Sequence, residues 1–334
     1  MPQSILLTGA SGVVGTELVK LFPEEDLILG RHRAQPESGA RQIAIDIRAP
    51  HLGLNKTEYS RLADEITSIV HAAAVTDMGA AAEGLEETNI NGVKNILTLA
   101  TDAEVPLHYV STAYCTEDFG PKRTSRSAYI ESKRAAETLV ENSGLDWTII
   151  RPSIVVGHSK TGQIATFQGF HLFVGSMLRG RLPLIPLDPS DRCDFVPADL
   201  IAKGIIKIVR TPQYGHAYWL TAGNTALTIE EMIEAGQPFA KTIGKDLSNL
   251  ILADPETAEK VHLPGLKERL PRRLKERLHV MMELSSVMAT AEPFPTDIPK
   301  LVQDIPMTHG FHTDVLRANI RHWGSENRYD FNGL

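Results

Sequence analysis

A tyrosine and a lysine four residues apart are the side chains of this chain best suited to proton transfer. Residues 129–133 read Tyr-Ile-Glu-Ser-Lys, and residues four apart share one face of a helix. An ammonium group beside a phenol favours the phenolate and lowers the phenol pKa. We therefore predict that Tyr129 donates or accepts a proton near neutral pH, with Lys133 lowering its pKa. On its own, the pair also fits an ordinary exposed helix face.

A glycine-rich segment near the amino terminus predicts a dinucleotide-binding loop. Gly9, Gly12 and Gly15 follow the apolar residues 4–7 and lead into a predicted helix over residues 16–22. Glycines at this spacing let the backbone turn sharply and approach a pyrophosphate closely, and the first amides of the helix then face the phosphates. The residues expected to contact the cofactor here are Gly9, Ser11, Gly12, Val13, Val14 and Gly15.

Alternating strands and helices must position these residues. Short apolar runs predict strands, and apolar residues at helical spacing predict helices between them. The predicted strands cover residues 4–7, 27–29, 42–45, 69–72, 107–110 and 147–155, and further helices cover 91–100 and 128–142. Repeated strand–helix units form a parallel sheet covered on both faces. The fold class is therefore α/β, a doubly wound Rossmann sheet.

The composition changes after about Thr228, where strands become rare and proline-punctuated helical segments follow. We therefore predict a dinucleotide-binding Rossmann domain over residues 1–225 and a smaller, mostly helical substrate-binding or cap region over 226–334. The apolar residues within 163–190 are expected to contribute to the substrate pocket.

Charge and cysteine content limit the possible partners and compartment. The chain has 334 residues and a net charge of −7, which argues against general nucleic-acid binding. Cys115 and Cys193 are its only cysteines, so no disulfide framework is implied and a reducing compartment is expected. No apolar stretch approaches the roughly 18 residues of a membrane span. The first predicted strand leaves no room for a signal peptide, and we expect a cytoplasmic protein. His309 and His312 lack an evident third ligand, so no metal site is predicted.

Four segments, in this order, resemble the extended branch of the short-chain dehydrogenase/reductase superfamily. They are the glycine-rich loop, Val-Ser-Thr-Ala-Tyr at 110–114, the segment 129–133, and Arg-Pro-Ser-Ile-Val-Val-Gly at 151–157. The resemblance extends over residues 4–225 and implies an enzyme with a nicotinamide cofactor.

The resemblance also implies roles for individual residues. Thr112 would hydrogen-bond the reacting oxygen, with Ser111 as the second candidate. Tyr129 would be the acid or base, and Lys133 would lower its pKa and hold the nicotinamide ribose. The remaining cofactor contacts would come from Asp46 and Ile47 at the adenine, Ala72, Ala73 and Ala74 along the cofactor, and Pro152 and Ile154 at the nicotinamide.

The end of the second predicted strand favours NADPH over NADH. An NAD site usually carries an acidic residue there for the ribose 2′-hydroxyl, whereas this chain has Arg31 and Arg33. Two guanidinium groups suit a 2′-phosphate because they offer charge and paired hydrogen bonds. A solvated loop is the alternative interpretation of these arginines.

Within the extended branch, the motifs resemble the male-sterility and thioester-reductase group. That group uses NADPH to reduce an acyl thioester, bound to CoA or a carrier protein, to an aldehyde or an alcohol. A ketone reductase or a sugar-nucleotide epimerase is the alternative, although Ala113 and Tyr114 stand where sugar-modifying relatives carry an Asp-Glu pair. A non-catalytic NADP-binding regulatory protein is the alternative from another class, disfavoured by the complete catalytic set.

Residues 266–288 carry an apolar stripe at helical spacing, and their first half is basic. Arg272, Arg273 and Lys275 belong to that basic part. On an acidic protein, such a face could receive an acyl or peptidyl carrier protein, a CoA phosphate group or an anionic membrane. A substrate-domain helix with a solvated face is the alternative.

Overall fold

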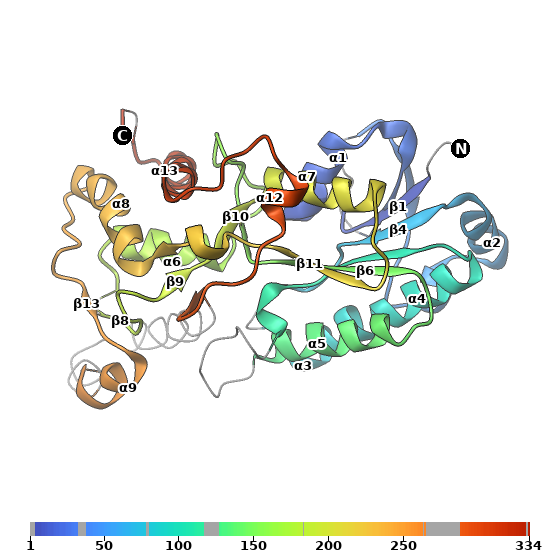
Figure 1. The fold of residues 1–334 in the computed structure, drawn as a ribbon, viewed down its shortest axis with the longest axis horizontal. Coiled ribbons are helices and arrows are strands. Elements are labelled where there is room, and N and C mark those ends of the chain that lie inside the picture. The colour runs from blue at the N-terminus through green and yellow to red at the C-terminus, as the bar shows by residue number, and fades with distance from the viewer. Residues whose placement is uncertain are drawn as a thin grey trace.

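A seven-stranded parallel sheet forms the centre of the protein, and it confirms the predicted Rossmann fold (Figure 1). The computed structural model describes residues 4–32, 38–77, 80–116, 127–182, 184–262, 264, 288–331 and 333–334. The strands are ordered β11-β6-β5-β4-β1-β2-β3. Their bounds are Ile5–Thr8 (β1), Leu27–Arg31 (β2), Arg41–Ala44 (β3), Ser68–His71 (β4), Leu107–Val110 (β5), Trp147–Pro152 (β6) and His216–Leu220 (β11). The strand order reverses between β1 and β4, which is where ligands bind in such sheets.

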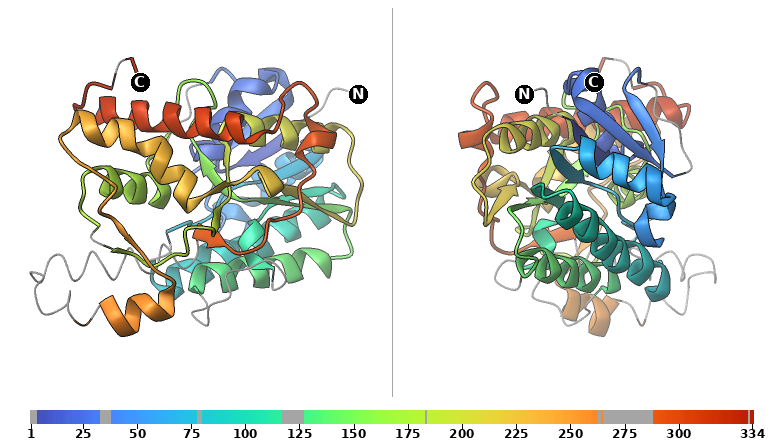
Figure 2. Two further views of the ribbon diagram at one scale, coloured as in Figure 1. Left: turned by 60° about the vertical axis from the view of Figure 1, so that its left-hand side comes forward. Right: turned by 90° about the vertical axis from the view of Figure 1, so that its right-hand side faces the viewer.

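Helices cover both faces of this sheet (Figures 1 and 2). Successive strand residues point to opposite faces, so Leu7 packs with one helical layer and Leu6 with the other. The first layer contains α1 (Val13–Leu21), α7 (Ala198–Arg210) and α12 (Ile298–Leu301), and the second contains α2 (Lys56–Glu65), α4 (Gly92–Asp102) and α5 (Ala128–Glu141). Because both faces are buried, the strands are nearly continuous apolar runs.

Several element boundaries differ from the predictions. Helix α1 begins at Val13, directly after Gly12, rather than at residue 16. The predicted strand 147–155 is interrupted: β6 ends at Pro152, and β7 (Ile154–Val156) leaves the main sheet to pair with β10 (Phe195–Pro197). Helix α4 is preceded by α3 (Ala82–Leu85) and a π-helical turn over Glu86–Asn91. Helices α2 and α7 and strand β11 were not predicted.

A second hydrophobic core lies beside the sheet and is built mainly by three helices. Residues of α6 (Gly169–Leu178), α8 (Ile229–Thr242) and α13 (His309–Glu326) pack together there, and Figure 2 shows α13 lying along α8. Short strands complete this region: β8 (Leu184–Ile185), β9 (Arg192–Cys193), β12 (Leu227–Thr228), β13 (Ile251–Leu252) and β14 (Ala289–Thr290), with a short helix α9 (Pro255–Thr257). Within the described ranges, no helix has both the length and the apolar character that crossing a bilayer requires.

Candidate active site

A groove crosses the carboxyl ends of the central strands, at the point where the strand order reverses. It consists of two adjoining cavities of about 440 and 410 Å³. Both are lined by Gly9, Gly12, Ala72 and Ala74, so the two cavities are continuous. The first cavity, of about 440 Å³, leads to the ends of β2 and β3. The second cavity, of about 410 Å³, leads to α5. A dinucleotide has the same two-ended shape.

The glycine-rich loop has the close packing that its sequence predicted. Gly9 adopts a left-handed backbone with φ +77°, and a Cβ atom there would lie 2.6 Å from the Ala73 nitrogen. A Cβ on Gly15 would lie 2.1 Å from the Gly9 oxygen. Both positions therefore exclude larger residues. Of the other loop residues, Ser11 lines the first cavity, and Val13, Val14 and Gly15 line the second.

The first cavity carries a cluster of charged side chains at the ends of β2 and β3. Asp46 accepts hydrogen bonds from the Arg48 backbone nitrogen, Nε and Nη2 at 3.0, 2.9 and 2.8 Å. These contacts, led by the Arg48 side chain, hold the pKa of Asp46 at about 2. His32 Nε2 lies 3.4 Å from Arg48 Nη2, and Arg31 and Ile47 complete this wall.

Arg48 and His32 were not predicted as site residues. The signal for Arg48 is its position two residues after Asp46, because a short aspartate side chain readily bonds the backbone two residues on. Arg33, predicted to contact a 2′-phosphate, lies outside the described residues.

The second cavity brings together the predicted catalytic set. Ser111, Thr112, Tyr129 and Lys133 all line it. Thr112 follows β5, while Tyr129 and Lys133 lie on the buried face of α5. Pro152 and Ile154, expected at the nicotinamide, line the same cavity.

The electrostatics of Tyr129 differ from the prediction. Burial raises the pKa of Tyr129 well above its usual value, and a hydrogen bond with Thr112 opposes that shift. Lys133 Nζ instead donates to the Val110 carbonyl at 2.8 Å and lies 4.4 Å from the centre of the Tyr109 ring. The prediction that Lys133 lowers the pKa of Tyr129 is therefore wrong for this structure, because desolvation dominates. A protonated Tyr129 is suited to donating a hydrogen bond or a proton.

Burial also changes the basic groups behind the cavity. It lowers the pKa of Lys133 to about 8. It lowers the pKa of His71 to about 3, with a further contribution from Lys133. His71 Nδ1 lies 2.6 Å from the Thr8 hydroxyl oxygen. Desolvation thus favours neutral side chains throughout this end of the groove.

Asn89 joins the loop after β4 to helix α5 and was not predicted as a site residue. Its Oδ1 accepts from the Val75 nitrogen at 2.8 Å, and its Nδ2 donates to the Val75 carbonyl and the Ser132 hydroxyl, both at 3.0 Å. Asn89 precedes the helix predicted over residues 91–100, and its flanking residues carry no signal of this role.

The outer wall of the second cavity is mostly apolar. Residues 168–172 form part of it, within the segment predicted to contribute to the substrate pocket. The large side chains there are Tyr114, Phe170, Leu172 and Met288, and the polar ones are Thr76, Asp77 and Gln168. Residues 266–288 carry the predicted apolar stripe with its basic first half. All of them except Met288 lie outside the described part of the chain.

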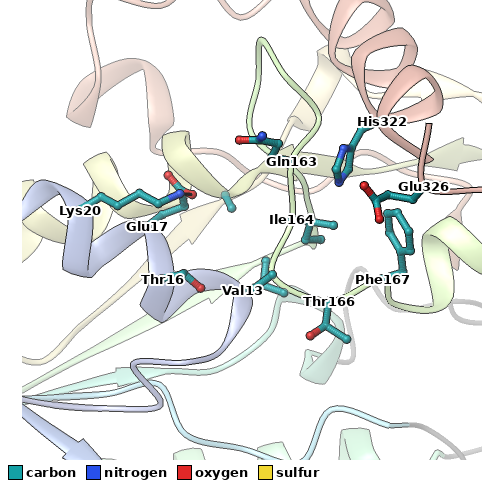
Figure 3. Close-up of a pocket in the computed structure, with 12 residues that line it drawn as sticks. Val13, Thr16, Glu17, Lys20, Gln163, Ile164, Thr166, Phe167, His322 and Glu326 are labelled. Carbon is teal, nitrogen blue, oxygen red and sulfur yellow. Dashed lines mark hydrogen bonds and ion pairs between the residues drawn. The ribbon is translucent and has the colours of Figure 1, made fainter. Parts of the chain in front are cut away.

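A separate groove of about 550 Å³ lies on the outer side of α1 (Figure 3). Residues 163–167 and helix α13 form its other walls. Lys20 Nζ pairs with the Glu17 carboxylate at 2.6 Å, and α13 contributes His322 and Glu326. Val13 is the one residue lining both this groove and the second cavity. The groove therefore adjoins the candidate active site but contains none of its catalytic set.

His309 and His312, the close pair of histidines in the sequence, lie in different surroundings. His312 is buried, and its Nε2 lies 3.1 Å from the Thr225 hydroxyl oxygen. His309 faces Glu231 at 3.7 Å. Across the residues that the structure describes, no three potential metal ligands come together.

Comparisons with known proteins agree with this geometry. The family model described as male sterility protein matches residues 24–205. The fusarin C synthetase of Gibberella moniliformis is 24% identical over 258 residues, which cover 68% of this chain but 6% of that synthetase. The terminal R domain from the myxalamid PKS-NRPS biosynthetic pathway has a TM-score of 0.76 at 21% identity, covering 98% of this chain and 92% of that one. The NAD complex of UDP-glucuronic acid 4-epimerase from Bacillus cereus has a TM-score of 0.61 at 17% identity, covering 99% of each chain. These solved structures share the fold.

Proposed function

Because the chain belongs to the male sterility protein family, within the extended short-chain dehydrogenase/reductases, we propose that it is an NADPH-dependent reductase of an acyl thioester. The observation that carries the proposal is the meeting of Thr112, Tyr129 and Lys133 in one cavity that continues into the glycine-rich loop. The fusarin C synthetase and the myxalamid terminal R domain support a thioester bound to a carrier protein. This chain spans only 6% of that synthetase. The activity of this chain on a carrier-bound thioester is therefore part of what we propose.

The site's residues suit the reduction of a carbonyl. A nicotinamide cofactor held along this groove would supply the hydride that adds to the thioester carbon. Thr112 and Tyr129 donate hydrogen bonds to the carbonyl oxygen as negative charge develops on it. When the carbon–sulfur bond breaks, the oxygen again forms a carbonyl, and the sulfur leaves as a thiolate that takes a proton from the solvent. The products are an aldehyde and a free thiol. If a second hydride reduces the aldehyde, Tyr129 donates the proton that makes the alcohol.

The first cavity supports NADPH rather than NADH. Arg31, His32 and Arg48 border it, and all three side chains can donate to a 2′-phosphate. Asp46 is already paired with Arg48, so its negative charge is compensated locally. Lys133, at the other end of the groove, would donate to a ribose hydroxyl.

The wall of the second cavity supports an acyl substrate over a sugar nucleotide. Phe170, Leu172 and Met288 offer apolar contact, which suits an acyl chain better than a polyhydroxylated sugar. Ala113 and Tyr114 replace the acidic pair typical of sugar-modifying relatives. Ala113 and Tyr114 carry no carboxyl group, so they cannot supply the acid–base chemistry of that acidic pair.

The proposal is tested by incubating the purified protein with NADPH or NADH and a matched set of substrates. The set contains one acyl group as its CoA, carrier-protein and N-acetylcysteamine thioesters, together with a ketone and a UDP-sugar. We expect NADPH oxidation accompanied by release of one free thiol per aldehyde formed. Ketone reduction without thiol release, epimerisation of the UDP-sugar, or cofactor binding without any turnover would each overturn the thioester assignment.

A further inference from the structure

Helix α5 presents a third ionisable residue on the face that carries Tyr129 and Lys133. Glu137 lies four residues beyond Lys133, so the three side chains point to the same side of the helix. All three residues are buried. Tyr129 and Lys133 line the cavity, whereas Glu137 is not among its lining residues. Its place on this face requires another explanation.

Glu137 forms a partly buried ion pair with Arg151 of β6. Arg151 Nη2 lies 2.6 Å from Oε2, and Nε lies 3.1 Å from Oε1. The guanidinium also lies 5.2 Å from the centre of the Trp219 ring. Burying two charges is costly, and such a pair is weak evidence for a stabilising role. The pair does fix the Glu137 carboxylate in one orientation.

Cys115 connects that carboxylate to the loop carrying Thr112. Its Sγ lies 3.1 Å from Glu137 Oε1, 3.1 Å from the Thr112 carbonyl oxygen and 3.7 Å from the Ser111 hydroxyl oxygen. The Cys115 carbonyl accepts from Arg134 Nε of α5 at 2.9 Å. Cys115 therefore joins the 3₁₀ turn Ala113–Cys115, which begins directly after Thr112, to the catalytic helix.

Cys115 is suited to being a hydrogen-bond donor rather than a nucleophile. Burial raises the pKa of its thiol to about 12, and Glu137 contributes to that shift. The thiol therefore keeps its proton near neutral pH and donates it to a carboxylate or a carbonyl oxygen. Cys115 is not among the residues that line the cavity.

We propose that Glu137 and Cys115 are positioning residues that hold Thr112 against α5, with its hydroxyl directed at Tyr129. The inference rests on the proposed function of Thr112. It assigns a role to the partly buried ion pair: Arg151 orients Glu137, Glu137 orients Cys115, and Cys115 fixes the turn after Thr112. None of the three touches the reacting atoms.

The first test compares Cys115→Ala and Cys115→Ser with Cys193→Ala, which alters the other buried cysteine. We expect Cys115→Ala to lower kcat about 10- to 100-fold, the scale of a small misplacement of a reacting group. The KM for the thioester and the Kd for NADPH should change less than about 2-fold, since Cys115 contacts neither. Cys115→Ser should recover most of kcat because its hydroxyl donates to the same acceptors. A Cys115→Ala enzyme with the kcat of Cys193→Ala would overturn the proposal.

A second readout needs no substrate, so it separates this inference from the thioester assignment. The ¹³Cζ resonance of Tyr129, identified by its loss in Tyr129→Phe, reports the hydrogen bonding of the phenol. We expect it to move in Cys115→Ala, to return toward wild type in Cys115→Ser, and to stay in place in Cys193→Ala. An unmoved resonance in Cys115→Ala contradicts the role of Cys115, whether or not any thioester is reduced.

The contribution of Glu137 is measured on the thiol itself. Infrared spectroscopy resolves the S–H stretch of Cys115, identified by its loss in Cys115→Ala. In Glu137→Gln the band should shift to higher frequency, because an amide oxygen is a weaker acceptor than a carboxylate. A band at the wild-type frequency in a folded Glu137→Gln protein would remove Glu137 from the proposal.

Discussion

The two ends of the groove use opposite physical means to tune their ionisable groups. At the ends of β2 and β3, partly exposed charges pair with one another, and Arg48 holds the pKa of Asp46 at about 2. At α5 the groups are buried. Desolvation there raises the pKa of Tyr129 and lowers that of Lys133 to about 8. One end is arranged to hold charges, and the other disfavours them.

This difference suits the two ends of the groove to different tasks, which are anion recognition and proton transfer. Charged groups that remain partly solvated can recognise an anion at little desolvation cost. Buried groups that stay largely uncharged can move protons without large compensating charges, because burial disfavours their ionised forms. Substitutions at the two ends should therefore change different measured quantities.

The largest expected effect is at the buried end, where Tyr129→Phe removes the proton donor. Activity should fall about 100-fold or more, the usual scale for a positioned acid or base, while the Kd for NADPH stays close to wild type. Steady-state kinetics and calorimetric titration measure the two quantities. Turnover close to wild type in the phenylalanine variant would show that the buried phenol is not the acid.

A smaller effect is expected at the charged end, from Arg31→Ala and Arg48→Ala. Each change should weaken binding of adenosine 2′,5′-bisphosphate about 10-fold or more, because a hydrogen bond between charged groups contributes about 1.5–3 kcal/mol. Binding of 5′-AMP, which lacks the 2′-phosphate, should change little. Arg41→Ala is a suitable control, since Arg41 pairs with Glu65 and does not line the cavity. Equal weakening of both nucleotides would disprove recognition of the 2′-phosphate.

The smallest effect is on folding, and it comes from Lys133→Met. The folded pKa of Lys133 is about 8, below its ordinary value of 10.5. Between these values the unfolded chain binds more protons, so this group makes stability rise with pH. Below pH 8 its charge is buried at a cost, and the methionine variant should be more stable at pH 7 by on the order of 1–3 kcal/mol.

Urea denaturation at pH 7 and pH 10 measures that difference. The advantage of Lys133→Met should shrink at the higher pH, where the wild-type lysine is neutral in the folded protein. Lys20→Met, at an exposed position on α1, controls for general charge removal. A variant that is less stable than wild type at pH 7 would mean that the contacts of Lys133 with Val110 and Tyr109 outweigh its desolvation.

The spacing of residues in the sequence predicted those parts of the site that depend on the conformation of a few consecutive residues. The glycine-rich loop, the shared helix face of Tyr129 and Lys133, and the arrangement of strands all follow from rules that act over a few residues. The break between β6 and β7 was missed because Ile154 and Val155 resume the apolar pattern directly after Arg151, Pro152 and Ser153, and the partner of β7 is the distant strand β10. The residues after Thr228 gave fewer periodic signals, and their helices are defined by packing in the second core.

The electrostatics could not be predicted in the same way. The pKa of Tyr129 depends on what packs over it, including segments far away in the chain, and the spacing to Lys133 carries none of that information. Arg48 and Glu137 were missed for a related reason. Each is an ordinary charged residue in the sequence, and its role depends on the partner that the fold brings to it.

The three hydrogen bonds of Asn89 have a consequence for the protein's slow motions. They tie Val75, in the loop beside the cofactor groove, to Ser132 in the middle of the catalytic helix. The Val75 amide can exchange with solvent deuterium only when this clamp opens, so its protection factor should match those of the amides in the core of α5 rather than those of a surface loop. The loop and the helix would then unfold together as one cooperative unit.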